Sequence, residues 1–227
     1  MDAADNLITA AEGMRIQSDS LGVIAQNLAN VSTAGFRSRE AAFSGFGREL
    51  EASVALSAAQ GPLRHTGVPT DFALSGPGFF AVAAPSGVRY TRDGRMSVDA
   101  SGYLADARGN RVLGSLGPVA FPRGAHVAED GRIVVSGAVR DRLRIVAFPK
   151  SCEPEADGLL RAPAGCTGQR AAATVHAGYL EDSGVDAIAQ MTAIIAAERS
   201  YEANEKVVAQ TDERLRRLVT DLPVLHS

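Results

Sequence analysis

The sequence predicts an α+β fold in which long N- and C-terminal helices pair as a coiled-coil hairpin and a central antiparallel all-β domain lies between them in the chain. Three observations predict it: apolar residues at helical spacing in the first 30 residues, the same spacing in the last 40, and a Gly- and Pro-rich stretch between. The expected organisation is a discontinuous helical core of residues 1–36 and 180–227, a connecting segment 37–60, and a β-domain 61–179.

The first helix is expected from about residue 4 to residue 31. Its apolar side chains recur at alternating spacings of three and four, which is typical of a narrow coiled-coil seam. The seam positions are Leu7, Ala10, Met14, Gln17, Leu21, Ile24, Leu28 and Val31. Ser32-Thr33-Ala34-Gly35 should end the helix, because Gly35 can adopt a positive φ that other residues resist.

The C-terminal helix is expected to be longer, because no Gly or Pro occurs between Val185 and Pro223. Asp182 or Ser183 would cap its N-terminus. Its seam positions again alternate by three and four: Ile194, Ala197, Tyr201, Asn204, Val208, Thr211, Leu215, Leu218 and Leu222. A seam of this length exceeds what a small domain can cover, so its natural partners are the first helix and neighbouring molecules.

The central region contains short apolar runs separated by turn signals, of which Arg92-Asp93-Gly94 and Glu129-Asp130-Gly131 are examples. These features indicate an antiparallel all-β unit. Residues 37–60 have mixed periodicity, and we expect them to be partly helical.

Composition excludes several classes of function. The formal net charge is −3, and basic residues form no cluster that could bind phosphates, so nucleic acid is not an expected partner. The sequence contains no run of 18 apolar residues, so no membrane-spanning helix is predicted, and the first 20 residues lack the apolar region of a Sec signal peptide. On these features alone the chain would be cytosolic.

No pattern indicates catalysis, a metal or a cofactor. Gly76 to Ala81 matches the dinucleotide pattern GxGxxA, but a strand-like run follows where that motif needs a helix. The four histidines are scattered, and no nucleophile elbow or P-loop occurs. We therefore expect no enzyme activity.

Two cysteines, Cys152 and Cys166, flank a loop rich in Pro, Glu, Asp and Gly. They are either unrelated loop thiols or a disulfide that closes a loop of about 15 residues, which the chain-entropy model values at roughly 3 kcal/mol. A disulfide would require an oxidising compartment.

Four segments in the same order resemble one known family, the bacterial flagellar axial proteins of the rod and hook class. NLANVSTAGFR, from Asn27 to Arg37, fits the family pattern N-L-A-N-x-x-T-x-G-F-[KR]. GPLRHTGVPTDFALSGPGFFAV, YTRDGRMSVDASGYLADARGNRVLG and GYLEDSGVDAIAQMTAIIAAERSYEANEKVV resemble three further family segments. One departure is Gly184, where the family usually has Asn before the last helix.

The resemblance implies a structural subunit of the flagellar basal-body rod that assembles helically, transmits torque and lines the export channel. The short connection after Arg37 favours the proximal rod, with the distal rod as the alternative; a coiled-coil-dimerised β binding module is an alternative of another class. The implied partners are other rod subunits, further copies of the chain and the flagellar type III export apparatus. The implied location is the periplasmic rod, reached without a Sec signal.

In such an assembly, Asn27 and Asn30 would fix the register of packing, because a misplaced buried amide loses its hydrogen bonds. Thr33 and Gly35 would turn the chain, and Phe36 would anchor the turn in a groove of a partner subunit. The expected assembly interface comprises Leu7, Met14, Leu21, Ile24, Asn27, Leu28, Asn30, Thr33, Gly35, Phe36, Ile194, Tyr201, Asn204, Val208 and Leu215.

The seam generates a first prediction. Leu21→Asp or Leu215→Asp should abolish rod assembly, because either change places a charge in an apolar seam, while the β-domain remains folded. Electron microscopy of basal bodies and circular dichroism of the purified variants check the two parts. Motile cells with fully built rods would contradict the assembly role.

Overall fold

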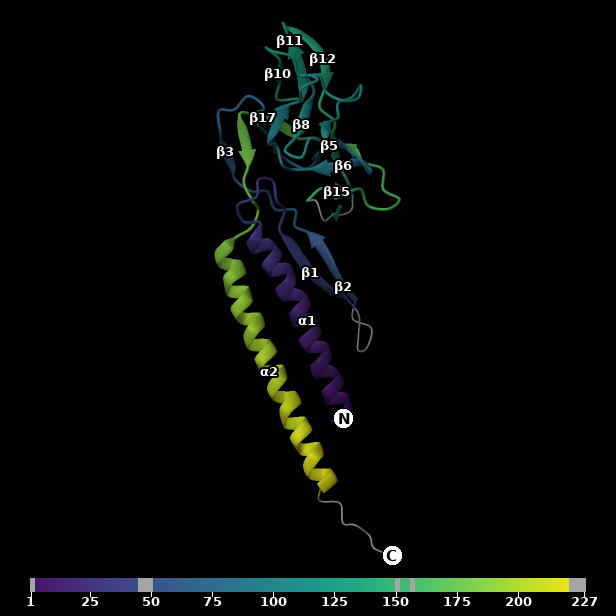
Figure 1. Ribbon diagram of the computed structural model, residues 1–227, viewed down its shortest axis with the longest axis vertical. Coiled ribbons are helices and arrows are strands. Elements are labelled where there is room, and N and C mark those ends of the chain that lie inside the picture. The colour runs from purple at the N-terminus through teal and green to yellow at the C-terminus, as the bar shows by residue number, and fades with distance from the viewer. Residues whose placement is uncertain (1–2, 45–50, 150–151, 156–157, 221–227) are drawn as a thin grey trace, which may run out of the picture. The chain divides into compact units, whose positions relative to one another are not determined.

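The computed structural model describes residues 3–44, 51–149, 152–155 and 158–220, which form two compact units (Figure 1). Unit 1 comprises residues 1–29, 39–55 and 186–227, and unit 2 comprises residues 30–38 and 56–185. Both units therefore draw on separate parts of the chain. The seam position Leu222 and the side chains of Leu7, Leu215 and Leu218 lie outside the described part.

Unit 1 consists of two long helices and a two-stranded sheet. Helix α1 spans Ala3–Ala29, helix α2 spans Ala187–Thr220, and the two lie side by side. Strands β1 (Arg39–Ser44) and β2 (Glu51–Leu56) form the sheet, and β1 packs against α1. The predicted pairing of the terminal helices is confirmed.

The expectation that residues 37–60 are partly helical is wrong for the described residues 37–44 and 51–60, which contain β1 and β2. Its Ala and Glu residues favour a helix locally, but strand preference depends on pairing and packing more than on composition. Here the partner strand and α1 supply the contacts that decide the conformation.

The N-terminal cap of α2 also differs from expectation. The Asp186 carboxylate accepts hydrogen bonds from the Ile188 and Ala189 amides at 2.9 and 3.1 Å, which is the geometry of an N-cap. Asp182 instead pairs with Arg64, and the Ser183 hydroxyl accepts from the Val185 amide. The chain remains extended through strand β18, so the helix begins after these residues.

Unit 2 is built from antiparallel strands. Its largest sheet runs in the order β14-β15-β6-β5-β9-β8-β7, with β13 pairing to β5 and β16. The three smaller sheets are β10-β11-β12, β17-β4 and β18-β3. The bounds are β3 Leu63–His65, β4 Phe72–Ser75, β5 Phe79–Ala84, β6 Gly87–Thr91, β7 Met96–Val98, β8 Leu104–Asp106, β9 Arg111–Val112, β10 His126–Val127, β11 Arg132–Val135, β12 Ala138–Arg142, β13 Ile145–Ala147, β14 Glu153–Pro154, β15 Leu160–Arg161, β16 Gln169–Arg170, β17 Thr174–Ala177 and β18 Tyr179–Glu181.

The core of unit 2 lies among these sheets and is apolar. Its fully buried side chains include Phe72, Phe80, Leu104 and Ile133, which come from four different strands. Strand β5 begins directly after Gly78, and no helix follows the GxGxxA match. The match therefore spans the turn before β5 and the first residues of that strand.

A buried ion cluster ties together three distant segments of unit 2. Glu181, at the end of β18, is 2% exposed, and its carboxylate accepts from Arg92 Nε at 2.5 Å and lies 3.4 Å from Arg37 Nη2. The Gly61 amide donates a further hydrogen bond to it at 3.3 Å. The Glu181 carboxylate thus joins the turn after α1, the turn after β6 and the segment that leads to α2.

The two arginines are further held by backbone carbonyls. Arg92 donates to Gly78, Leu74 and Gly76, and Arg37 donates to Ala58 and Ala59. Burial lowers the pKa of the Arg37 guanidinium, and the Glu181 carboxylate acts in the opposite direction. Because Glu181 is the one carboxylate between the two guanidinium groups, Arg37 and Arg92 depend on it to remain charged while buried.

Replacement of Glu181 tests this dependence. Glu181→Gln should reduce the free energy of unfolding of unit 2 by about 3–5 kcal/mol, because two buried arginines lose their counter-charge. The measurement is urea denaturation followed by far-UV circular dichroism.

The neighbouring residue supplies the control. Asp182→Asn removes only the exposed pair with Arg64, in which the side chains are 38% and 56% exposed, and should cost less than about 1 kcal/mol. Equal urea midpoints for the two variants would show that the buried cluster is not what stabilises unit 2.

Candidate assembly surface

The seam residues of α1 and α2 face each other within unit 1. Ala10 and Ala197 are buried at 6% and 7% exposure. The remaining described seam positions of the two helices are half-buried, except Tyr201, which is 41% exposed. The half-buried ones are Met14, Gln17, Leu21, Ile24, Leu28, Ile194, Asn204, Val208 and Thr211. The periodicity therefore identifies the surface by which the helices pair within one chain.

Asn27, near the C-terminal end of α1, contacts both β1 and α2. Its side-chain amide nitrogen donates to the Arg39 carbonyl at 2.8 Å, and its oxygen accepts from the Arg39 amide at 2.8 Å. The same nitrogen lies 3.2 Å from the Gln190 side-chain oxygen of α2. Asn27 is 2% exposed and thus binds the first residue of β1 as a neighbouring strand would, while it also contacts α2. The register that this amide fixes is that of its own chain.

A second asparagine, Asn204 of α2, lies close to α1 at Gly13, nearer the N-terminal end of α1. A Cβ added at Gly13 of α1 would lie 3.0 Å from the Asn204 side-chain nitrogen. Gly13 therefore allows a close approach at this point, and a larger residue would force Asn204 to move.

The family-like turn after α1 lies in unit 2. The Thr33 hydroxyl donates to the Asn30 side-chain oxygen at 3.1 Å, and the Thr33 amide donates to the Asn30 carbonyl at 3.0 Å. The Gly35 amide donates to the Glu181 carbonyl at 2.7 Å, and the half-buried Phe36 accepts from the Gly184 amide through its carbonyl. These bonds hold the turn against the strand that leads to α2.

Gly35 is required at its position for two reasons. Its φ is +67°, and an added Cβ would lie 2.4 Å from the Arg92 carbonyl. Arg37 follows two residues later and enters the ion cluster. The spacing of glycine and arginine in NLANVSTAGFR is thus explained by packing inside one chain.

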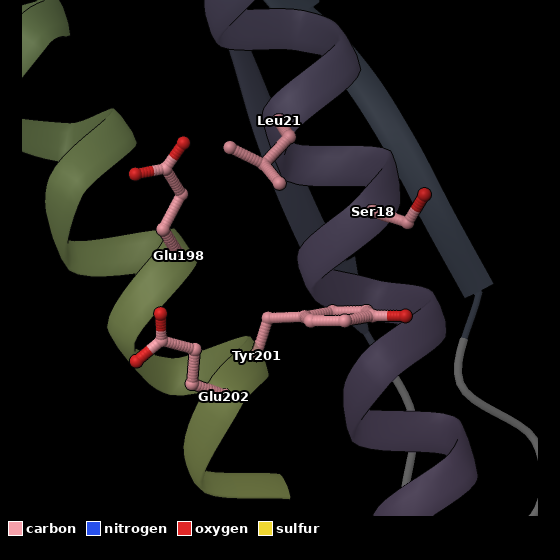
Figure 2. Close-up of a pocket in the computed structure, with 5 residues that line it drawn as sticks. All are labelled: Ser18, Leu21, Glu198, Tyr201 and Glu202. Carbon is pink, nitrogen blue, oxygen red and sulfur yellow. The ribbon is translucent and has the colours of Figure 1, made fainter. Parts of the chain in front are cut away.

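A groove opens between α1 and α2. Figure 2 shows Ser18 and Leu21 on α1 and Glu198, Tyr201 and Glu202 on α2, with the Tyr201 ring extended toward α1. Its volume is about 590 Å³. Glu198 and Glu202 lie one helical turn apart, and like charges at this spacing repel each other. The groove is therefore acidic on its α2 side.

An apolar strip lies next to this groove and was not singled out from the sequence. Ile188, Met191 and Ile195 are 78%, 53% and 52% exposed. At about 100° per residue they share a face with Glu198 and Glu202, beside the seam that meets α1. We call these three residues the α2 strip. Large apolar side chains rarely gather on a free surface, so the strip is a candidate contact surface.

Other expected features are placed as follows. Cys152 is buried and Cys166 half-buried, both as free thiols. Among the described residues, no group of three or more His, Cys, Asp or Glu side chains could hold a metal ion, and no helix is long and apolar enough to cross a membrane.

Replacement of Asn27 tests its bridging role. Asn27→Ala should lower the free energy of unfolding of unit 1 by about 1–3 kcal/mol, because the Arg39 amide and carbonyl lose their buried partner. The Arg39 amide hydrogen should also exchange with solvent faster, as measured by hydrogen exchange.

Gln26→Ala is the matched control, since the neighbouring Gln26 side chain accepts an exposed hydrogen bond from the Arg39 side chain. Unchanged protection of the Arg39 amide in Asn27→Ala would contradict the bridging role.

Two family models match the chain. "Flagellar hook protein FlgE/F/G D1 domain" matches residues 73–139 in unit 2, and "Flagellar basal body rod FlgEFG protein C-terminal" matches residues 176–221, which contain β18 and α2. The second match includes Glu181, Asp186 and the α2 strip. Both matches therefore coincide with the structural features described above.

Similar proteins match along almost the whole chain. The flagellar basal-body rod protein FlgF of Caulobacter vibrioides is 32% identical over 89% of this chain and 91% of its own length. FlgF of Escherichia coli is 32% identical over 94% and 96%, and FlgG of Buchnera aphidicola is 27% identical over 91% and 95%. With this coverage and identity, the chain belongs to the flagellar basal-body rod protein family, whose members are structural and not enzymatic.

Proposed function

We propose that the chain is a proximal-rod subunit whose helix pair packs against neighbouring subunits to form the axial core of the rod. The observation that carries this proposal is the α2 strip: a helix pair whose seam is mostly half-buried still exposes three large apolar side chains on one face of α2. In a rod the neighbouring subunit covers such a face. A contact between two different surfaces that does not close on itself produces a helical assembly.

The proximal position is supported by the comparisons. The FlgF relatives are 30–32% identical to the chain, whereas the FlgG relatives are 26–29% identical. The short stretch between Arg37 and Gly61 supports the same assignment. A β binding module dimerised by coiled coils does not account for similarity to rod proteins over about nine-tenths of the chain.

The mechanism is mechanical. The helix pairs of successive subunits line the export channel, and their buried seams resist sliding when torque is applied, since each misaligned pair would expose apolar surface. The β units make the outer contacts. Glu198 and Glu202 favour a neighbour that presents basic side chains, because these relieve the repulsion between the two carboxylates. The chain reaches the periplasmic rod through the flagellar type III export apparatus.

Two adjacent residues of α2 provide a matched test. Ile195→Asp places a charge in the α2 strip and should remove the subunit from the rod, because the contact with the neighbour would bury an unpaired carboxylate. Ala196→Asp places the same charge on an exposed position about 100° around the helix and should assemble normally. Epitope-tagged copies are located in purified hook–basal bodies by immunoblot and electron microscopy.

The height of the wild-type tag decides between proximal and distal rod. A tag found only in the soluble fraction, with complete basal bodies, would overturn the rod assignment. Normal incorporation of Ile195→Asp would overturn the role of the α2 strip while leaving the assignment in place.

A further inference from the structure

The two cysteines belong to one excursion of the chain at the edge of the largest sheet of unit 2. Strands β13 and β16 pair through Val146 with Arg170 and Ala147 with Gln169, so the chain leaves and returns at the same place. Within the excursion, β14 pairs with β15, and β15 pairs with β6. Cys152 directly precedes β14, and Cys166 lies between β15 and β16.

Both cysteines lie close to the segment that follows β15. Cys152 is 4% exposed and belongs to an apolar cluster with Tyr90, Val146 and Leu160, against which Ala162 packs. The Cys166 amide donates a hydrogen bond to the Pro163 carbonyl at 3.1 Å. Because β14 and β15 are antiparallel, Cys152 before β14 and Cys166 after β15 lie at the same end of this strand pair.

The ionisation of Cys152 agrees with this placement. Burial, and to a smaller extent the charge of the Cys166 thiolate, together raise the pKa of the Cys152 thiol to about 11. The second effect falls off with distance, so it supports the nearness already given by the strand pairing.

We propose that Cys152 and Cys166 form a reversible disulfide that closes the excursion between β13 and β16 when the chain enters an oxidising compartment. The structure, with both thiols free, then represents the reduced form. The pairing itself follows from unit 2 alone, and only the compartment rests on the proposed periplasmic location.

The oxidant is a dithiol–disulfide exchange partner, either a protein disulfide or oxidised glutathione. The half-buried Cys166 thiol loses its proton, attacks one sulfur of the partner disulfide and releases the other sulfur as a thiolate. The Cys152 thiolate then attacks the Cys166 sulfur and expels the second partner thiolate. The chain loses two protons and two electrons, and the partner is reduced to two thiols. Since burial keeps Cys152 protonated, Cys166 is the first nucleophile.

The disulfide would affect the edge of the largest sheet of unit 2. Strand β14 is two residues long and forms one end of the nine-stranded sheet. A disulfide before β14 and after β15 would hold this short edge against β6. Because exposed sheet edges are sites of unwanted pairing, a closed edge would keep unit 2 from pairing with another chain through β14.

Equilibration of the full chain with glutathione redox buffers tests the proposal. The purified chain is held at defined ratios of reduced to oxidised glutathione, alkylated and analysed by mass spectrometry. Oxidation should remove both alkylatable thiols together, lower the mass by about 2 Da and yield a peptide that links Cys152 to Cys166. The native chain should form this bond with an equilibrium constant on the order of a hundredfold above that of the urea-unfolded chain, as expected for a ring of about 15 residues.

Single-cysteine variants are the controls. Cys152→Ala should accumulate a glutathione adduct on Cys166, and Cys166→Ser should react slowly because Cys152 is buried. In the wild-type chain, a glutathione adduct on Cys166 with Cys152 still free, or a native equilibrium constant no greater than the unfolded one, would overturn the proposal.

A cellular measurement separates this proposal from the proposed function. Rapid alkylation of cells that carry the tagged chain should find the thiols blocked in basal bodies. Free thiols there, with the bond formed readily in the purified chain, would contradict the oxidising location and leave the rod assignment to the tag experiment.

Discussion

The structure depends on a single buried carboxylate, that of Glu181, placed between the guanidinium groups of Arg37 and Arg92. Ions of this kind are costly to bury, and they are tolerated only when charges and hydrogen bonds are matched. Here the match requires residues from three distant segments to meet. The turn after α1, the turn after β6 and the end of β18 therefore meet at one place in unit 2.

This requirement gives a physical reason for the spacing of the family-like motifs. Gly35 leaves room for the Arg92 backbone, its amide bonds the Glu181 carbonyl, and Arg37 follows at the distance needed to reach the carboxylate. The residues thus serve the folding of each subunit first. In unit 1 Asn27 has a comparable role, since one amide joins α1 to the first residue of β1 and to Gln190 of α2.

In unit 1, the contacts made inside the chain are distinct from the apolar surface that remains exposed. The α1 and α2 seams lie between the two helices of one chain, and the α2 strip remains exposed, where we propose that a neighbour packs. A subunit that satisfied every apolar side chain by itself would have no driving force for association. In the proposed contact, the acidic residues that continue the strip would fix orientation more than they add affinity.

Periodicity alone determined the existence and pairing of the two helices, because a seam at alternating spacings of three and four buries well only against another helix. Gly-containing turn signals likewise determined that the centre is an antiparallel β unit. The strands β1 and β2 could not be predicted, since Ala- and Glu-rich segments become strands only when a partner strand and α1 lie beside them. The cap at Asp186 could not be predicted, because it depends on how far β18 extends. The ion cluster and the partners of Asn27 could not be predicted either, because they join residues more than 10 positions apart in the sequence. Sequence patterns record local spacing, whereas only the tertiary structure decides which distant charges and amides meet, and therefore which apolar face is left for assembly.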